Sequence, residues 1–261
     1  MPLHRLQVGR VRKLLAAAGV SNTTLLVFAS DNGPEVSPAG GQFTSSFPNP
    51  GVTGGLSGRK RALLEGGIRT TFVVEAPWLV ARANGGSGGP LRLDDYAASH
   101  TDLVPTLLDL LGSGDIRRNT SWPLDGLSLV PALTGSVTTD RAGALGWLCA
   151  WQLTTDNAAA ECPSGPAVQP PSCPANFTAP DSLPQVAWME GPLKLIACRN
   201  SQAAWRWRLF NITADPTETL DLFADRITEA DAIFQRLHTW LVSVNSSRTV
   251  ESECASQHHA T

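Results

Sequence analysis

The most constraining feature of this chain is a continuous apolar run, Thr24 to Ala29, that stops abruptly at the polar segment Ser30 to Pro34. An unbroken apolar run, unlike an alternating one, predicts a strand covered on both faces, as in a parallel sheet. In open α/β sheets, ligands bind beyond the carboxyl ends of the strands. Asp31 and Asn32 occupy that position, and their oxygens suit Ca²⁺ or Mg²⁺. The alternative is an Asx turn that only closes the strand.

The first half of the chain has the pattern of an α/β structure. Apolar residues at helical spacing predict a helix that ends at Gly19. A second helix is expected to contain Thr106 to Leu111, with Pro105 in its first turn and Gly112 beyond its end. A second strand is expected at 68–75. The Gly- and Ser-rich residues 35–58 predict a long surface loop, and residues 84–89 a hairpin or disordered tip.

The second half has the pattern of a small antiparallel α+β unit. A Pro-, Ala- and Ser-rich insertion is expected over about 157–184. Short strands and one amphipathic helix then follow, at 185–188, 193–198, 205–211 and 227–241. We therefore expect two domains, 1–145 and 146–261.

Lys60 is a candidate anion-binding residue. It follows Gly58 and precedes Glu65-Gly66-Gly67 by a short spacer, so a glycine-flanked loop would present its ammonium group. Such a point charge can face the oxygens of a sulfate or phosphate. The alternative is a solvated basic loop.

Charge and hydropathy exclude several classes of function. The formal net charge is -3, the isoelectric point is near 5.9, and Arg59-Lys60-Arg61 is the main basic cluster. This gives no electrostatic footprint for a nucleic acid. No stretch reaches the roughly 20 apolar residues that cross a bilayer, so we expect no membrane partner. The sequence is silent on oligomeric state.

Two features predict the secretory pathway, as an extracellular or lysosomal glycoprotein. Five Asn-x-Ser/Thr sequons occur, at Asn22, Asn119, Asn176, Asn211 and Asn245. Four clustered cysteines predict two disulfides, with Cys254 apart from them: Cys149, Cys162, Cys173 and Cys198. The alternative is chance sequons and free thiols. Residues 1–15 lack the apolar core of a signal peptide, so a signal is expected upstream.

Five blocks of this sequence resemble the sulfatase family, in the family's order. Val8 to Pro34 resembles its helix, strand and Ser-Asp-Asn-Gly turn. Residues 56–69 resemble its L-R-G-x-K-x-x-x-x-E-G-G-x-R block with the spacing kept, although Thr70-Thr71 replaces the usual Val-Pro. Residues 99–109 resemble its S-H-x-D-x-x-P-T-L-L-D helix. The elements D-G-x-x-L-x-P-x-L-x-G and L-Y-D-L-x-x-D-P-x-E resemble residues 125–135 and 209–218.

The resemblance implies the carboxyl-terminal half of an alkaline-phosphatase-like α/β sandwich that hydrolyses sulfuric esters, arylsulfatase-like. It implies that Asp31 and Asn32 bind a calcium ion and that Lys60 holds a sulfate oxygen as the catalytic residue in this chain. The substrate would be a small-molecule or glycan sulfate ester. His100 has two interpretations, a residue near the site or a structural residue that caps the following helix.

The departures from the family are as informative. The family's nucleophile is a formylglycine made from a C/S-x-P-x-R motif, and no such motif occurs in these 261 residues. The paired aspartates of the family's metal site are also absent, so the chain alone is expected to be inactive and to bind Ca²⁺ weakly. A phosphodiesterase or phosphonate hydrolase of the same superfamily, and a noncatalytic half-sulfatase binding module, are alternatives. A truncated gene and a true half-protein both remain possible origins.

Overall fold

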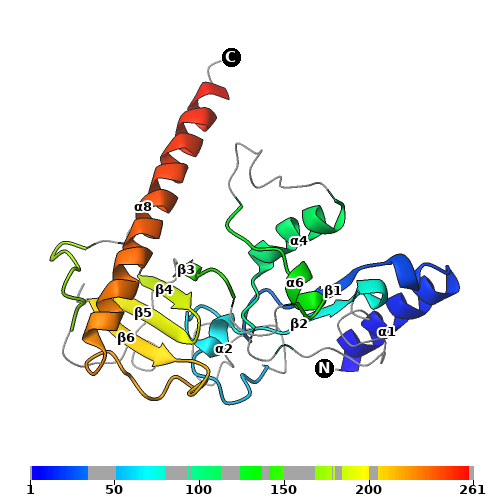
Figure 1. The fold of residues 1–261 in the computed structure, drawn as a ribbon, viewed down its shortest axis with the longest axis horizontal. Helices are drawn as coiled ribbons and strands as arrows, with labels where there is room; N and C mark the ends of the chain where they lie inside the picture. The colour runs from blue at the N-terminus through cyan, green and yellow to red at the C-terminus, as the bar shows by residue number, and fades with distance from the viewer. Residues whose placement is uncertain are drawn as a thin grey trace, which may run out of the picture. The chain divides into compact units, whose positions relative to one another are not determined.

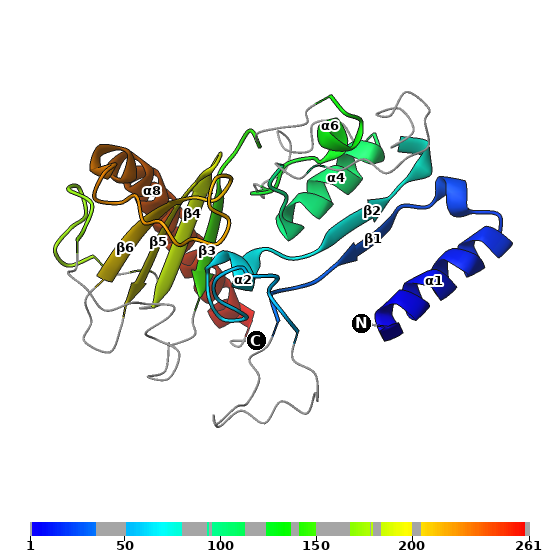
Figure 2. The same ribbon diagram turned by 90° about the horizontal axis from the view of Figure 1, so that it is seen from below.

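The computed structural model describes residues 2–34, 51–79, 93, 96–112, 124–136, 141–149, 168–177, 179, 184–199 and 205–258. These residues form two compact units (Figures 1 and 2). The first unit combines residues 1–30 with 71–143, and the second combines residues 31–70 with 144–261. The predicted tip at 84–89, and most of the loop at 35–58 and of the insertion at 157–184, lie outside the described residues.

The first unit packs helices against a two-stranded sheet. Its elements are α1 (Pro2–Ala17), η1 (Ser21–Thr23), β1 (Leu26–Ala29), β2 (Phe72–Glu75), η2 (His100–Asp102), α4 (Leu103–Leu110) and α6 (Val130–Leu133). Glycines with positive φ follow α1 and α4, Gly19 at +72° and Gly112 at +65°. Only glycine adopts this conformation without strain, so both helices end where the sequence predicts.

The prediction of a parallel strand covered on both faces is wrong for the pairing that the structure describes. Strand β1 pairs antiparallel with β2, and Phe28 lies opposite Val73. These two side chains are 39% and 51% exposed, whereas Phe72 and Val74 pack on an apolar core that includes Leu129. An apolar run gives the burial expected of a strand but not the direction of its neighbour, which explains the error.

The second unit is built on a four-stranded antiparallel sheet in the order β3-β4-β5-β6. Its elements are α2 (Glu65–Ile68), β3 (Leu145–Cys149), β4 (Gln185–Glu190), β5 (Leu193–Arg199), β6 (Trp205–Asn211) and α8 (Ile227–His258). The predicted strands β4 to β6 and the closing helix are confirmed, and β3 was not predicted. This is the expected antiparallel α+β unit.

Each face of this sheet has a different cover. Helix α8 covers one face (Figure 2). It packs there through a core that includes Phe234 and Leu237. On the opposite face, Ala62 to Leu64 pack against Ile196 and Phe210. Because side chains alternate along a strand, one short sheet supports both the long helix and the loop that carries Lys60.

The cysteines differ from the prediction of two disulfides. Cys149 and Cys173 are free thiols, and Cys198 is disulfide-bonded. Two bridges among the four clustered cysteines are therefore excluded. The reason is positional, because Cys149 lies on β3 with its thiol directed at the carbonyl oxygen of Arg61, 3.3 Å away.

No helix among the described residues combines the length and the apolar character needed to span a membrane.

Candidate functional site

The Asp31-Asn32 turn begins directly after β1 and is held by its own polar groups. The backbone N–H of Asn32 donates to Asp31 Oδ1 at 2.9 Å, and Asn32 Nδ2 donates to the carbonyl oxygen of Gly33 at 2.8 Å. Asp31 is exposed and Asn32 is half-buried. The turn therefore has the local closure expected of an Asx turn, and it also presents carboxylate and amide groups at the surface of the second unit.

The backbone brings Lys60 beside this turn. The N–H of Lys60 donates to the carbonyl oxygen of Pro34 at 3.1 Å, and the N–H of Gly33 donates to the carbonyl oxygen of Gly67 at 2.7 Å. Gly66 in turn donates to the carbonyl oxygen of Ser57 at 2.6 Å. Three segments that are separate in the sequence thus meet: residues 31–34, called the Asp31 turn, residues 57–64, called the Lys60 loop, and the Glu65-Gly66-Gly67 turn, which is part of the short helix α2.

Glycines make this close approach possible. A Cβ atom at Gly33 would collide with the carbonyl oxygen of Gly66, and one at Gly66 with those of Gly58 and Ser57. A Cβ atom at Gly67 would meet two further carbonyl oxygens of the Lys60 loop. These positions therefore need glycine because backbone packs on backbone. The loop also contains two left-handed residues, Gly58 at φ +76° and Arg61 at φ +83°.

The Lys60 loop is fastened to the sheet of the second unit. Gln185 on β4 accepts a hydrogen bond from the N–H of Leu63 at 3.3 Å and donates one to the carbonyl oxygen of Arg61 at 2.8 Å. With the apolar contacts of Ala62 to Leu64, these bonds fix the loop just after Lys60. The backbone that carries Lys60 is thus rigidly supported.

A buried ion cluster lies next to the loop. Lys194 Nζ on β5 is 2.9 Å from Glu65 Oε1 and 2.9 Å from Glu218 Oε1. The N–H of Glu65 also donates to Glu218 Oε2 at 2.6 Å. Burial raises the pKa of Glu218, against the lowering effect of Lys194. Sequence reasoning missed this cluster because Lys194 and Glu218 are far from Glu65 in the chain.

The donor chemistry of the turn fits a calcium ion, but the described ligand set is incomplete. Ca²⁺ takes about 6 to 8 oxygen ligands, and Asp31 and Asn32 together offer two side chains. Within the described ranges, no group of three or more histidine, cysteine or acidic side chains has the arrangement of a metal site. Calcium would therefore need further oxygen ligands from outside these residues or from water.

His100 does not cap the helix that follows it. The cap is Ser99, whose hydroxyl oxygen accepts from the N–H of Thr101 at 3.4 Å, while Asp102 accepts from the N–H of Ser99 at 2.8 Å. His100 is exposed, and its ring lies edge-on to Phe72 with centroids 6.1 Å apart. The predicted capping role is wrong for this residue.

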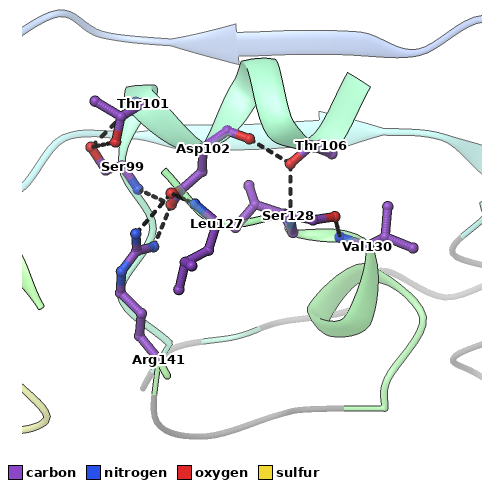
Figure 3. A network of polar contacts seen from close by, with 9 residues as sticks. Ser99, Thr101, Asp102, Thr106, Leu127, Ser128, Val130 and Arg141 are labelled. Atoms are coloured by element: carbon purple, nitrogen blue, oxygen red, sulfur yellow. Dashed lines mark hydrogen bonds and ion pairs between the residues drawn. The ribbon is translucent and has the colours of Figure 1, made fainter. Parts of the chain in front are cut away.

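Asp102 is the centre of a buried polar network in the first unit (Figure 3). Its carboxylate receives two hydrogen bonds from Arg141, at 2.5 and 2.8 Å, and one from the N–H of Leu127 at 2.7 Å. Thr106 continues the network by accepting from the N–H of Leu129 at 2.8 Å. These contacts join residues 99–106 to residues 127–129 and to Arg141.

Comparison with known proteins finds similarity to sulfatases. Residues 7–113 match the sulfatase family model. The N-acetylgalactosamine-6-sulfatase of Canis lupus familiaris is 32% identical over 136 residues, which are 51% of this chain and 22% of that protein. The chain thus spans about a fifth of the length of this relative. The predicted resemblance to sulfatases is confirmed.

Solved structures share the fold. A sulfatase from Pseudoalteromonas sp. matches with a TM-score of 0.54 at 18% identity, over 90% of this chain and 40% of that one. The phosphonate monoester hydrolase of Agrobacterium radiobacter matches with a TM-score of 0.50 at 20% identity, over 92% of this chain and 39% of that one. The predicted partial sulfatase-type α/β fold is confirmed.

Proposed function

We propose that this chain forms part of a sulfuric ester hydrolase, because residues 7–113 match the sulfatase family model. In this role Lys60 binds an oxygen of the sulfate group, and Asp31 and Asn32 contribute ligands to a calcium ion. The lysine acts as a fixed positive charge facing the sulfuryl oxygens. A bound calcium ion would supply further positive charge for the same oxygens.

One observation carries this proposal. The hydrogen bond from the N–H of Lys60 to the carbonyl oxygen of Pro34, 3.1 Å long, joins the lysine to the turn that contains Asp31 and Asn32. The three candidate residues thus come from two segments in backbone contact within one compact unit. A cation and two hard oxygen ligands in this arrangement suit a bound oxyanion with its counter-ion.

The described residues supply charge and not a nucleophile. The chain contains no C/S-x-P-x-R sequence, which in the family becomes formylglycine. We therefore expect the chain by itself to bind sulfate without turning over sulfate esters.

The canine relative, an N-acetylgalactosamine-6-sulfatase by name, supports a proposal for the substrate class. A glycan or small-molecule sulfate ester is thus the proposed substrate. The match to a phosphonate monoester hydrolase supports a second candidate, a phosphonate or phosphate ester. The two candidates differ in the anion that the site prefers, so sulfate and methylphosphonate can be compared directly as ligands.

The decisive experiment is a titration of inorganic sulfate into the chain, with calcium present, followed by calorimetry. Lys60→Met should weaken binding by about tenfold or more, because a hydrogen bond to a charged group contributes roughly 1.5–3 kcal/mol. Lys13→Met is the control, since Lys13 is exposed on α1 in the other unit. Equal sulfate affinities of the wild type and Lys60→Met would refute the proposal.

A second measurement addresses catalysis. Turnover of an aryl sulfate by the chain, at a rate that Lys60→Ala leaves unchanged, would contradict both the expected inactivity and the role of the lysine. Tighter binding of methylphosphonate than of sulfate would favour the second candidate.

We also propose that the protein is lysosomal or secreted. Described sequons such as Asn22 and Asn176 are exposed, as an acceptor for a glycan must be. Mass spectrometry of the protein secreted from eukaryotic cells tests for glycans at these two positions.

A further inference from the structure

Lys194 is a fully buried cation in the middle of the second unit. Its side chain is 0% exposed, and its ammonium group lies between the carboxylates of Glu65 and Glu218, which are 5% and 0% exposed. Burial of an ammonium group is costly, and an apolar side chain of similar length would fill this position without that cost. The lysine must therefore do something other than fill space.

Glu218 connects Lys194 to the backbone of the Glu65-Gly66-Gly67 turn. One oxygen of its carboxylate lies 2.9 Å from the ammonium, and the other accepts from the N–H of Glu65 at 2.6 Å. Glu218 has φ +55°, a conformation that residues with side chains rarely adopt. Asp215 holds this unusual turn by accepting from the N–H groups of Thr219 and Leu220, at 2.7 and 2.8 Å.

The residues directly after Glu65 hold the two parts of the sulfate site. Gly66 donates its N–H to Ser57 in the Lys60 loop, and Gly67 accepts from the N–H of Gly33 in the Asp31 turn. Ser57 Oγ also donates to the carbonyl oxygen of Thr217, 2.5 Å away, which precedes Glu218. A continuous set of contacts thus runs from Lys194 to both candidate parts of the site.

We propose that Lys194 is a positioning residue of the sulfate site. By binding both Glu65 and Glu218, it fixes the turn that holds the segments of Lys60 and Asp31 next to each other. This inference rests on the proposed sulfate-binding role of Lys60. Lys194 itself touches neither sulfate nor calcium. Its effect passes through Glu65 to the neighbouring glycines.

Other contacts hold different parts of the loop, so the role of Lys194 is separable. Ala62 to Leu64 are held by apolar packing and by Gln185. Among the described residues, Arg69 also pairs with Glu65, at 3.7 Å. Its side chain is 44% exposed, and an exposed arginine replaces a buried ammonium poorly. Loss of Lys194 is therefore expected to loosen residues 65–67 while the preceding segment stays on the sheet.

The test compares Lys194→Met with Leu237→Ala. Methionine keeps the length of the side chain and removes the charge. Leu237 is fully buried against the opposite face of the sheet, in the core that α8 forms, so its truncation destabilises the same unit without touching the loop. For both variants and the wild type, sulfate affinity with calcium, the unfolding midpoint and amide hydrogen exchange at Gly33 and Gly66 are measured.

Lys194→Met should lower sulfate affinity roughly tenfold, by analogy with the low end of the losses seen when the outer-shell partners of metal ligands are removed. It should also speed exchange at the Gly33 and Gly66 amides. Leu237→Ala should lower the unfolding midpoint but keep the wild-type affinity and the wild-type exchange at these glycines. Equal loss of affinity in the two folded variants would mean that Lys194 only stabilises the unit, which overturns the inference.

The test also gives a result if the variant does not fold or if the wild type binds no sulfate. If Lys194→Met does not fold, it is replaced by the double variant Lys194→Met with Glu218→Gln. The double variant removes one charge of each sign and keeps an acceptor for the N–H of Glu65. The same loss of sulfate affinity and the same faster exchange are expected. If the wild type binds no sulfate, the proposed function fails, and hydrogen exchange tests only whether Lys194 fixes the turn. Unchanged protection of Gly33 and Gly66 in the variant overturns that part of the inference, and faster exchange supports it.

Discussion

Replacement of Arg141 by methionine should destabilise the first unit by about 3 kcal/mol. The guanidinium donates to both oxygens of Asp102, and the two side chains are 3% and 0% exposed (Figure 3). Methionine fills much of the same volume but leaves the carboxylate buried without its cation.

The magnitude follows from what remains around the carboxylate. Removal of one partner of a buried ion pair costs about 3–5 kcal/mol. Asp102 keeps two backbone donors in the variant, the N–H groups of Ser99 and Leu127, at 2.8 and 2.7 Å. Because hydrogen bonds to a charged group contribute roughly 1.5–3 kcal/mol each, the low end of the range is expected.

The assay is urea denaturation followed by circular dichroism, with hydrogen exchange of the Leu127 amide as a local probe of the same network. Arg12→Met is the matched control, since Arg12 pairs with Glu75 at 2.7 Å but the side chains are 58% and 38% exposed. An exposed pair contributes about 0–1 kcal/mol. Equal destabilisation by the two substitutions would refute the argument from burial.

Gly67→Ala should destabilise the second unit by about 1–3 kcal/mol in thermal unfolding, because the added Cβ meets backbone carbonyl oxygens. Gly9→Ala is the control: its Cβ meets nothing on helix α1, so it should stabilise the protein by about 0.5–1 kcal/mol in the same assay. Hydrogen bonds from Leu220 and Thr217 hold the pKa of Asp215 at about 2, below its usual 3.8. They therefore stabilise the fold above pH 3.8, and this effect is lost as the pH falls toward about 2. The stability difference between the wild type and Asp215→Asn should shrink over that interval, and a constant difference would contradict this prediction. Burial raises the pKa of the Cys173 thiol to about 11, so mass spectrometry should find slower alkylation by iodoacetamide than for free cysteine at about pH 8.

Local sequence signals predicted much of the fold. Gly19 and Gly112 end the helices where their positive φ is needed, and the short strands β4 to β6 followed by α8 form the predicted antiparallel unit. The glycines of the Glu65-Gly66-Gly67 turn, recognised through the family resemblance, turned out to be required by backbone packing.

Long-range pairing was not predictable from the same signals. The apolar run before Asp31 has no feature that specifies an antiparallel neighbour. The sequence pattern predicts only that Lys194 lies in a strand, and its partners Glu65 and Glu218 are 129 and 24 positions away. Asp102 likewise gives no sign in the sequence of its partner Arg141. The ligand roles of Asp31, Asn32 and Lys60 remain predictions, although the backbone contact between their segments supports a shared site.

The central claim is that the Asp31 turn and Lys60 act on one oxyanion. The most direct measurement is a double-mutant cycle on sulfate affinity, with calcium present, for Asp31→Asn, Lys60→Met and the double variant. The account predicts a coupling energy of at least about 0.5 kcal/mol, as found for residues in one network. Additive effects, which are typical of sites more than about 7–10 Å apart, would contradict it.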